Sequence, residues 1–185
     1  SFTNYPRIDA ATTDVADWMT KRGFNHFCVN PRPGAWESYR EHLRGPLAAR
    51  GMTVSLDHHT LPFWLPVEEF YEHHPGYFAL VGGERRADAQ PCLSRPEVRQ
   101  IVASRILGFL EENPEVTEVG LWPRDGYGWC ECDECRAAYV GGPSWWSPQM
   151  PCVTDAYVGF VNAVAEAVGE HRPEVRLTAL AYVNY

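Results

Sequence analysis

The sequence lacks long apolar runs and any concentration of positive charge. None of its apolar runs approaches the roughly 18 residues that a membrane-spanning helix requires. The formal net charge is −8, and the basic residues are scattered apart from the short stretch GERR at 83–86. Nucleic-acid binding draws its affinity from a basic stripe. We therefore expect neither a membrane span nor a nucleic-acid partner.

Nucleotide-binding and targeting motifs are missing too. The sequence contains no GxGxxG stretch and no GxxxxGKS or GxxxxGKT stretch. A nucleotide-binding sheet is therefore disfavoured, and we expect no organic cofactor. The opening SFTNYPRIDA has no initiator Met, and it has neither the basic start nor the apolar stretch of a signal peptide. A signal preceding Ser1 would lie outside this sequence, so these residues leave the cellular location open.

Glycine, proline and large aromatic residues are abundant instead. The 185 residues include 15 Gly, 15 Pro, 7 Trp and 9 Tyr, and 45% of all residues are hydrophobic. The apolar content predicts a folded chain with one core of ordinary size. Aromatic side chains on Gly/Pro-rich loops suit a carbohydrate-binding surface. The same side chains also fill cores, so both roles remain open.

Helical and strand patterns alternate four times along the chain. The helical patterns cover 12–22, 36–50 (interrupted at Gly45–Pro46), 94–113 and 154–171, with Ser94 and Thr154 as expected caps. The expected strands are 24–30, 53–58, 118–122 and 176–182. This order predicts an α/β fold whose parallel strands are neighbours in sequence order. The strands read as nearly continuous apolar runs, which favours a sheet covered on both faces.

Polar and aromatic residues recur where each expected strand ends. Active sites of (βα)8 barrels are built at this carboxyl-terminal rim. Four βα units make about half of such a barrel. We therefore expect residues 1–185 to be part of a TIM-barrel-like domain of a larger enzyme, with the remainder of the barrel following Tyr185.

Four stretches carry a family resemblance. HHPGYFALVGGERR, QPCLSRPEVRQIV, LWPRDGYGWCECDEC and LTALAYVNY together resemble the bacterial domain-of-unknown-function family 4838, which includes glycoside hydrolase family 163. The resemblance implies a (βα)8 barrel that acts on N-acetylglucosamine-containing glycans, as an endo-β-N-acetylglucosaminidase does. It also implies a secreted or cell-envelope-associated bacterial enzyme.

The expected rim supplies the candidate site. The similar barrels of family 20 hexosaminidases carry an Asp-Glu pair after their fourth strand, where this sequence reads Arg124-Asp125-Gly126. Asp125 is therefore the candidate catalytic residue. Because the glutamate is missing, a non-catalytic glycan-binding barrel is the alternative. The period of a strand places Asp57 and His59 on one face. The candidate substrate-binding residues are Asn30, Asp57, His58, His59, Trp122, Arg124, Trp129, Tyr182 and Asn184. Trp145 and Trp146 either line the site or pack their loop.

Cysteines cluster just after this rim. Cys130, Cys132 and Cys135 form a C-x-C-x-x-C run whose three sulfurs can share one tetrahedral zinc ion. Cys92 is the favoured fourth ligand because the family resemblance includes it, and Cys152 is the second choice. Such a closed site would be structural and would pin a Cys/Trp/Gly-rich loop insertion over 123–152. Reduced buried thiols and disulfides are the alternatives.

Overall fold

The fold is built on a four-stranded parallel sheet. A computed structural model describes residues 12–126, 128–144, 147–182 and 184–185. The strands lie side by side in sequence order, and every neighbouring pair is parallel. They are β1 (His26–Val29), β2 (Thr53–Leu56), β5 (Val116–Gly120) and β6 (Arg176–Thr178). The four predicted strands and their parallel order are confirmed, but β6 ends at Thr178, four residues before the predicted end at Tyr182.

Five helices occupy the predicted helical segments. They are α1 (Thr12–Lys21), α2 (Ala35–His42), α3 (Arg44–Ala48), α6 (Pro96–Glu112) and α8 (Thr154–Gly169). The expected break falls at Leu43 rather than at Gly45–Pro46. Pro46 lies in the first turn of α3, where its missing N–H costs no hydrogen bond. None of the helices in the described parts of the chain is long and apolar enough to span a membrane.

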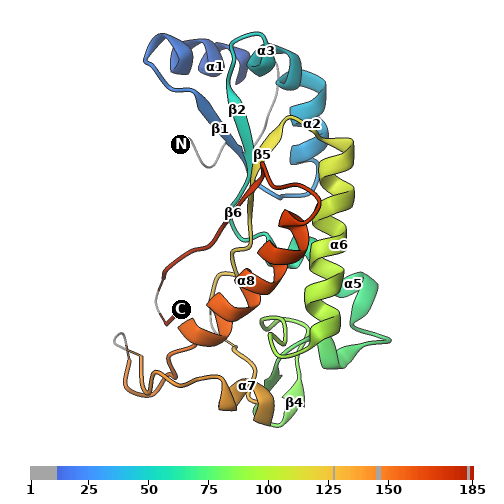
Figure 1. Ribbon diagram of the computed structural model, residues 1–185, viewed down its shortest axis with the longest axis vertical. Coiled ribbons are helices and arrows are strands. Elements are labelled where there is room, and N and C mark those ends of the chain that lie inside the picture. The colour runs from blue at the N-terminus through green and yellow to red at the C-terminus, as the bar shows by residue number, and fades with distance from the viewer. Residues whose placement is uncertain (1–11, 127, 145–146, 183) are drawn as a thin grey trace.

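Several short elements were not predicted. They are α4 (Leu61–Trp64), α5 (Val67–Phe70), the 3-10 helix η1 (Pro75–Tyr77), the antiparallel hairpin of β3 (Leu80–Val81) and β4 (Glu84–Arg85), and α7 (Asp133–Ala137). Elements of two to five residues are too short to display a period of their own. In Figure 1, β4 and α7 lie together at the opposite end of the molecule from α1 and α3.

The main core lies on one face of the sheet. Phe27, Val54, Leu56 and Val119 are buried on this face. They belong to one cluster with the apolar sides of α1, α2, α6 and α8. Figure 1 shows α6 and α8 side by side, and these two helices pack directly on each other. Burial of these aliphatic and aromatic side chains is the main favourable term in folding.

The opposite face of the sheet carries mainly polar side chains, so the strands alternate more than the predicted, nearly continuous apolar runs. His26 on β1 contacts the hydroxyl oxygens of Thr53 and Ser55 on β2 at 2.8 and 2.9 Å. Arg176 on β6 pairs with Glu118 on β5 at 2.9 Å. These pairs connect neighbouring strands. For the fully buried Ser55, the contact with His26 offsets the cost of removing the hydroxyl from water, whereas Arg176 remains exposed.

Two predicted helix caps are also wrong. Helix α6 is capped by the extended backbone of Arg95, one residue later than Ser94. The Ser94 hydroxyl lies 3.3 Å from the Cys92 sulfur instead. Helix α8 starts at Thr154 itself, whose hydroxyl lies 3.2 Å from the Cys152 sulfur. In both cases a thiol two residues earlier competes for the hydroxyl that would cap the helix.

Gly120, at the end of β5, should tolerate no side chain. A Cβ atom there would lie 2.5 Å from Asp57 Oδ1 and 3.2 Å from Asp57 Cα. We expect Gly120→Ala to reduce the free energy of unfolding by about 1–3 kcal/mol, as overpacking does. Urea denaturation of the full chain measures this. The matched control is Gly108→Ala in α6, where a Cβ meets nothing within 4 Å. That change should be neutral or stabilising. Equal stability of the two variants would contradict the expectation.

Candidate functional site

Asp57 is the buried carboxylate at the rim of the sheet. It follows β2 directly and is 7% exposed. Its Oδ1 atom accepts a 2.6 Å hydrogen bond from the Thr178 hydroxyl on β6. The same hydroxyl oxygen accepts a 3.3 Å hydrogen bond from Trp122 Nε1. Thr178 therefore fixes both a carboxylate and an aromatic ring at the carboxyl ends of adjacent strands.

The two histidines after Asp57 leave the strand geometry. His58 has a φ of +88°, a left-handed conformation that non-glycine residues adopt rarely. His59 Nδ1 lies 2.5 Å from the carbonyl oxygen of Pro123. The strand alternation ends at Leu56. The argument that places Asp57 and His59 on one face therefore does not apply here.

His58 lies within electrostatic range of two carboxylates. Burial lowers the pKa of His58, and the neighbouring His59 and Arg32 lower it further. The carboxylates of Asp125 and Asp57 act in the opposite direction. The His58 ring centroid is 4.5 Å from that of His59 and 5.9 Å from that of Trp122. The rim thus brings together the predicted residues Asp57, His58, His59 and Trp122, and Asp125 lies near enough to affect the pKa of His58.

Gln90 holds the backbone that carries Asp125, and the sequence reasoning missed it. This fully buried side chain donates from Nε2 to the carbonyl oxygens of Arg124 (2.7 Å) and Gly126 (3.3 Å). Its Oε1 atom accepts from the Arg124 backbone N–H at 3.0 Å. Asp125 lies between these anchors with an exposed side chain. Gln90 opens the QPCLS stretch of the family resemblance, and that was the one signal available.

The predicted Trp129 and Asn184 form a second group next to the rim. Trp129 Nε1 donates to Asn184 Oδ1 at 3.2 Å, and Asn184 Nδ2 donates to the Pro151 carbonyl oxygen at 3.1 Å. Both residues are buried. The Trp129 and Tyr185 ring centroids are 5.2 Å apart. Burial, with a further contribution from Asp125, raises the pKa of Tyr185 to about 12. Tyr185 therefore lies between the two groups.

The remaining candidates are more dispersed. Tyr182 is 52% exposed, and its ring centroid is 6.4 Å from that of Tyr185. Asn30 is half-buried directly after β1. The Arg124 guanidinium reaches the carbonyl oxygen of Asp88 at 3.4 Å and so points toward the segment that follows β4. Trp145 and Trp146 lie outside the described residues.

Four cysteines converge beside this loop. The sulfur atoms of Cys92, Cys130, Cys132 and Cys135 all lie within 4.8 Å of one another, and all four residues are buried. The Cys92 sulfur is 3.5 Å from that of Cys130 and 3.8 Å from those of Cys132 and Cys135. Cys152 is not a member of this cluster. All six cysteines of the chain are free.

The surroundings of the cysteine cluster suit a thiolate centre. The Leu80 N–H and the Arg85 guanidinium approach the Cys130 sulfur at 3.4 and 3.6 Å. Hydrogen bonds from Cys130 and Cys135 lower the pKa of Cys92, and hydrogen bonds with Cys130 and Cys92 raise the pKa of Cys135, so the group favours one thiolate among the thiols. A tetrahedron with metal–sulfur bonds of about 2.3 Å has edges of about 3.8 Å. The four sulfurs therefore fit the tetrahedral coordination of a metal ion.

Comparison with known proteins reveals one family and two similar folds. The family model described as "Domain of unknown function (DUF4838)" matches residues 7–185. The crystal structure of the alpha-galactosidase from Lactobacillus brevis has a TM-score of 0.54 at 11% identity, over 92% of this chain and 24% of that chain. The galactosidase domain of alpha-galactosidase-sucrose kinase, AgaSK, has a TM-score of 0.51 at 13% identity, over 91% and 24%. No curated protein matches the chain.

These likenesses show the fold. Both solved structures are TIM-barrel domains, and the chain supplies four parallel strands with their helices. The expected partial (βα)8 architecture is confirmed. The chain spans about a quarter of the length of each solved structure.

The electrostatic effect of Asp125 on His58 can be tested by titration. In the full chain we expect His58 to titrate below the ordinary histidine value of about 6.5. Removing the Asp125 charge with Asp125→Asn should lower that pKa further, since the carboxylate favours the protonated imidazole. NMR titration of the imidazole resonances measures both values. Asp14→Asn, at an exposed position in α1, is the control. If the His58 pKa is unchanged in Asp125→Asn, the Asp125 carboxylate does not act on His58 and the two residues do not belong to one site.

Proposed function

The chain belongs to the DUF4838 family, and on that premise we propose that it is part of a glycoside hydrolase acting on N-acetylglucosamine-containing glycans. The observation that carries the proposal is the gathering of Asp57, His58, Trp122 and Asp125 at the carboxyl ends of neighbouring parallel strands. Barrel enzymes build their active sites at this rim. The names of the two solved structures, both alpha-galactosidases, support chemistry at a glycosidic bond.

The proposed roles follow from how each side chain is held. Glycoside cleavage needs one group that protonates the leaving oxygen and another that attacks, activates water or supports an attacking substrate amide. Asp125 is exposed on a loop whose backbone is fixed by Gln90, so it can contact the substrate directly. Asp57 is fixed by the hydrogen bond from Thr178, and this bond connects the carboxyl ends of β2 and β6. Trp122 offers a ring to the apolar C–H face of a sugar.

One observation favours a second candidate, a non-catalytic glycan-binding barrel. Asp125 is exposed, and the sequence Arg124-Asp125-Gly126 has no neighbouring glutamate. A proton donor in a glycosidase is generally held in a less polar setting, which keeps it protonated at neutral pH. In this alternative the same rim binds the glycan, and Asp125 accepts hydrogen bonds from its hydroxyl groups.

We further propose that the cysteine cluster holds a structural zinc ion. Four buried thiols close the coordination shell, which is typical of structural sites and leaves no position for substrate. The Leu80 N–H and Arg85 lie where they would offset the charge of the thiolates. In this role Cys92, Cys130, Cys132 and Cys135 fix the loop that carries Trp129 against the segment that precedes α6.

Replacing Asp125 separates the two candidate functions. In the full-length protein with a complex N-glycan as substrate, Asp125→Asn should lower turnover by at least ~100-fold, the low end for a lost acid–base group. The substitution keeps the size of the side chain and removes its charge. Glycan release followed by mass spectrometry measures the rate. Asp14→Asn in α1 should leave it unchanged.

Other outcomes of the same experiment are informative. Unchanged turnover in a folded Asp125→Asn variant would exclude a catalytic role for Asp125. Glycan binding without turnover in the unsubstituted protein would favour the binding barrel over the hydrolase.

Zinc content tests the metal proposal. The full chain, purified without chelators, should contain about one zinc ion per chain, measured by elemental mass spectrometry. Cys92→Ser removes one thiolate and should lose most of the metal together with several kcal/mol of stability, since metal binding is coupled to folding. Cys152→Ser lies outside the cluster and should retain the zinc. Metal-free protein with four alkylatable thiols, or with disulfides among them, would contradict the proposal.

A further inference from the structure

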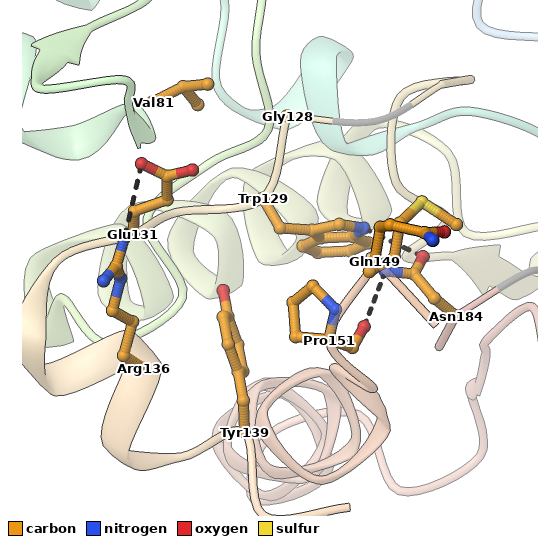
Figure 2. A pocket seen from close by; sticks show the side chains of 10 residues that line it. Val81, Gly128, Trp129, Glu131, Arg136, Tyr139, Gln149, Pro151 and Asn184 are labelled. Atoms are coloured by element: carbon orange, nitrogen blue, oxygen red, sulfur yellow. Dashed lines mark hydrogen bonds and ion pairs between the residues drawn. The ribbon is translucent and has the colours of Figure 1, made fainter. Parts of the chain in front are cut away.

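A pocket lies beyond the rim, on the far side of Trp129. Its volume is about 510 Å³, within the range of small-ligand sites. Figure 2 shows its walls, which come from the cysteine-rich loop, the segment around Pro151 and the end of the chain. The side chains that define its chemistry are those of Trp129, Glu131, Arg136, Tyr139, Gln149 and Asn184.

One part of the wall is aromatic and rigid. Trp129 is fixed through its hydrogen bond to Asn184, which in turn binds the Pro151 carbonyl oxygen. The Tyr139 hydroxyl donates to the Cys130 carbonyl oxygen at 2.8 Å. In Figure 2 the rings of Trp129, Tyr139 and Pro151 face the same space. Tyr139 and Pro151 are accessible and give the pocket apolar surface, whereas the buried Trp129 forms its fixed back wall and exposes only an edge.

The polar part of the wall carries no net charge. Glu131 and Arg136 pair across 3.5 Å, and the Glu131 carboxylate also accepts the Gly82 backbone N–H at 2.9 Å. The remaining polar group that a ligand can reach is the exposed amide of Gln149, because the buried Asn184 amide is already bound to Trp129 and Pro151. An ionic ligand would meet the opposing charge of this pair, whereas a neutral ligand with both donors and acceptors would not. Aromatic faces combined with such mixed, neutral hydrogen-bonding groups match a sugar residue.

The pocket adjoins the rim through Tyr185. Its ring packs against Trp129, with the ring centroids 5.2 Å apart. Gly128, which lines the pocket, lies three residues after Asp125 on the same loop. A chain of sugars with one residue at Asp125 therefore needs only a short extension to reach the pocket.

The cysteine cluster sets the shape of the pocket. Trp129 and Glu131 flank Cys130 in the sequence, and Arg136 follows Cys135. These three lining residues are therefore each adjacent in sequence to a cysteine of the cluster. Any group that holds the cysteines together also holds these walls apart at a fixed distance.

We propose that this pocket is a second subsite, which binds a neutral sugar residue of the glycan beyond the residue held at the rim. The inference rests on the proposed function and deepens it, because it assigns to the enzyme a recognition element for oligosaccharides rather than for single sugars. It moves Trp129 and Asn184 from the site of cleavage to this second subsite.

Blocking the pocket tests the inference. Gln149 is exposed at the pocket wall, so Gln149→Trp fills the space without disturbing the core. In the full-length protein, titration calorimetry should show at least ~10-fold weaker binding of a biantennary complex N-glycan, the equivalent of one or two lost hydrogen bonds with their stacking contact. Binding of free N-acetylglucosamine at the rim, followed by NMR, should change less than about 2-fold.

Two further variants make the result specific. Gln149→Ala should weaken glycan binding by about 3- to 10-fold through the loss of one amide hydrogen bond. Gln100→Trp places the same ring at an exposed position of α6 that does not line this pocket, and it should bind both sugars normally. Circular dichroism confirms that each variant is folded.

The outcomes distinguish the subsite from the function. If the N-glycan binds the unsubstituted protein and Gln149→Trp leaves its affinity unchanged, the second subsite is wrong while the proposed function stands. If neither sugar binds the unsubstituted protein, the proposed function fails and the subsite fails with it. If both sugars weaken equally in Gln149→Trp, the pocket is part of the rim site and not a separate subsite.

Discussion

The convergence of four cysteine sulfurs is the contact on which the outer half of this structure depends. It joins the segment before α6 to the loop after β5, two parts of the chain that are about 40 residues apart. Together with Ala79 and Ala89 these cysteines form a small core of their own, separate from the main one. A core of six small residues buries too little apolar surface to order two loops. Leu80, Val81 and Tyr139 add to this packing. The metal coordination proposed above would stabilise the two loops further.

The inner half depends on a different constraint, the close approach of β2 and β5. Gly120 leaves room for Asp57, and Asp57 then reaches Thr178 on β6. Thr60, just after the rim, is fully buried and binds the Gly120 carbonyl oxygen through its hydroxyl. The carboxylate is thus held by strands on two sides. Gln90 connects this rim to the cysteine cluster, because it lies two residues before Cys92 and binds the backbone on both sides of Asp125.

The sequence predicted the elements that have a period and missed the features that depend on single contacts. The long helices were located correctly because their apolar residues recur along eight or more positions, as in α6 and α8. The strands were located because each is a short apolar run that follows a glycine or proline break. The polar side chains on the opposite face of the sheet were missed because apolar residues dominate a strand as short as HFCV. The left-handed backbone of His58 has no signature in its side chain, so the alternation was extended too far. Gln90 could not be singled out in the sequence, because its role depends on three hydrogen bonds to a backbone segment more than 30 residues away. The cysteines were easier, because their spacing is itself a chemical constraint.

The glycine-rich loop after β5 is anchored at both of its ends. Gly126 and Gly128, on either side of the turn after Asp125, both have positive φ. Fixing such residues costs more conformational entropy than fixing any others. A loop with this composition would be too mobile to hold a side chain in one position unless both of its ends were anchored. Gln90 holds one end through the backbone of Arg124 and Gly126, and the cysteine cluster holds the other from Cys130 onward. The glycines then allow the close approach to Ala89 that a side chain at Gly128 would prevent, and the anchors remove the freedom that the glycines bring. The cysteines lie a few residues beyond Asp125 and outside the sheet, where they can hold the far end of this loop.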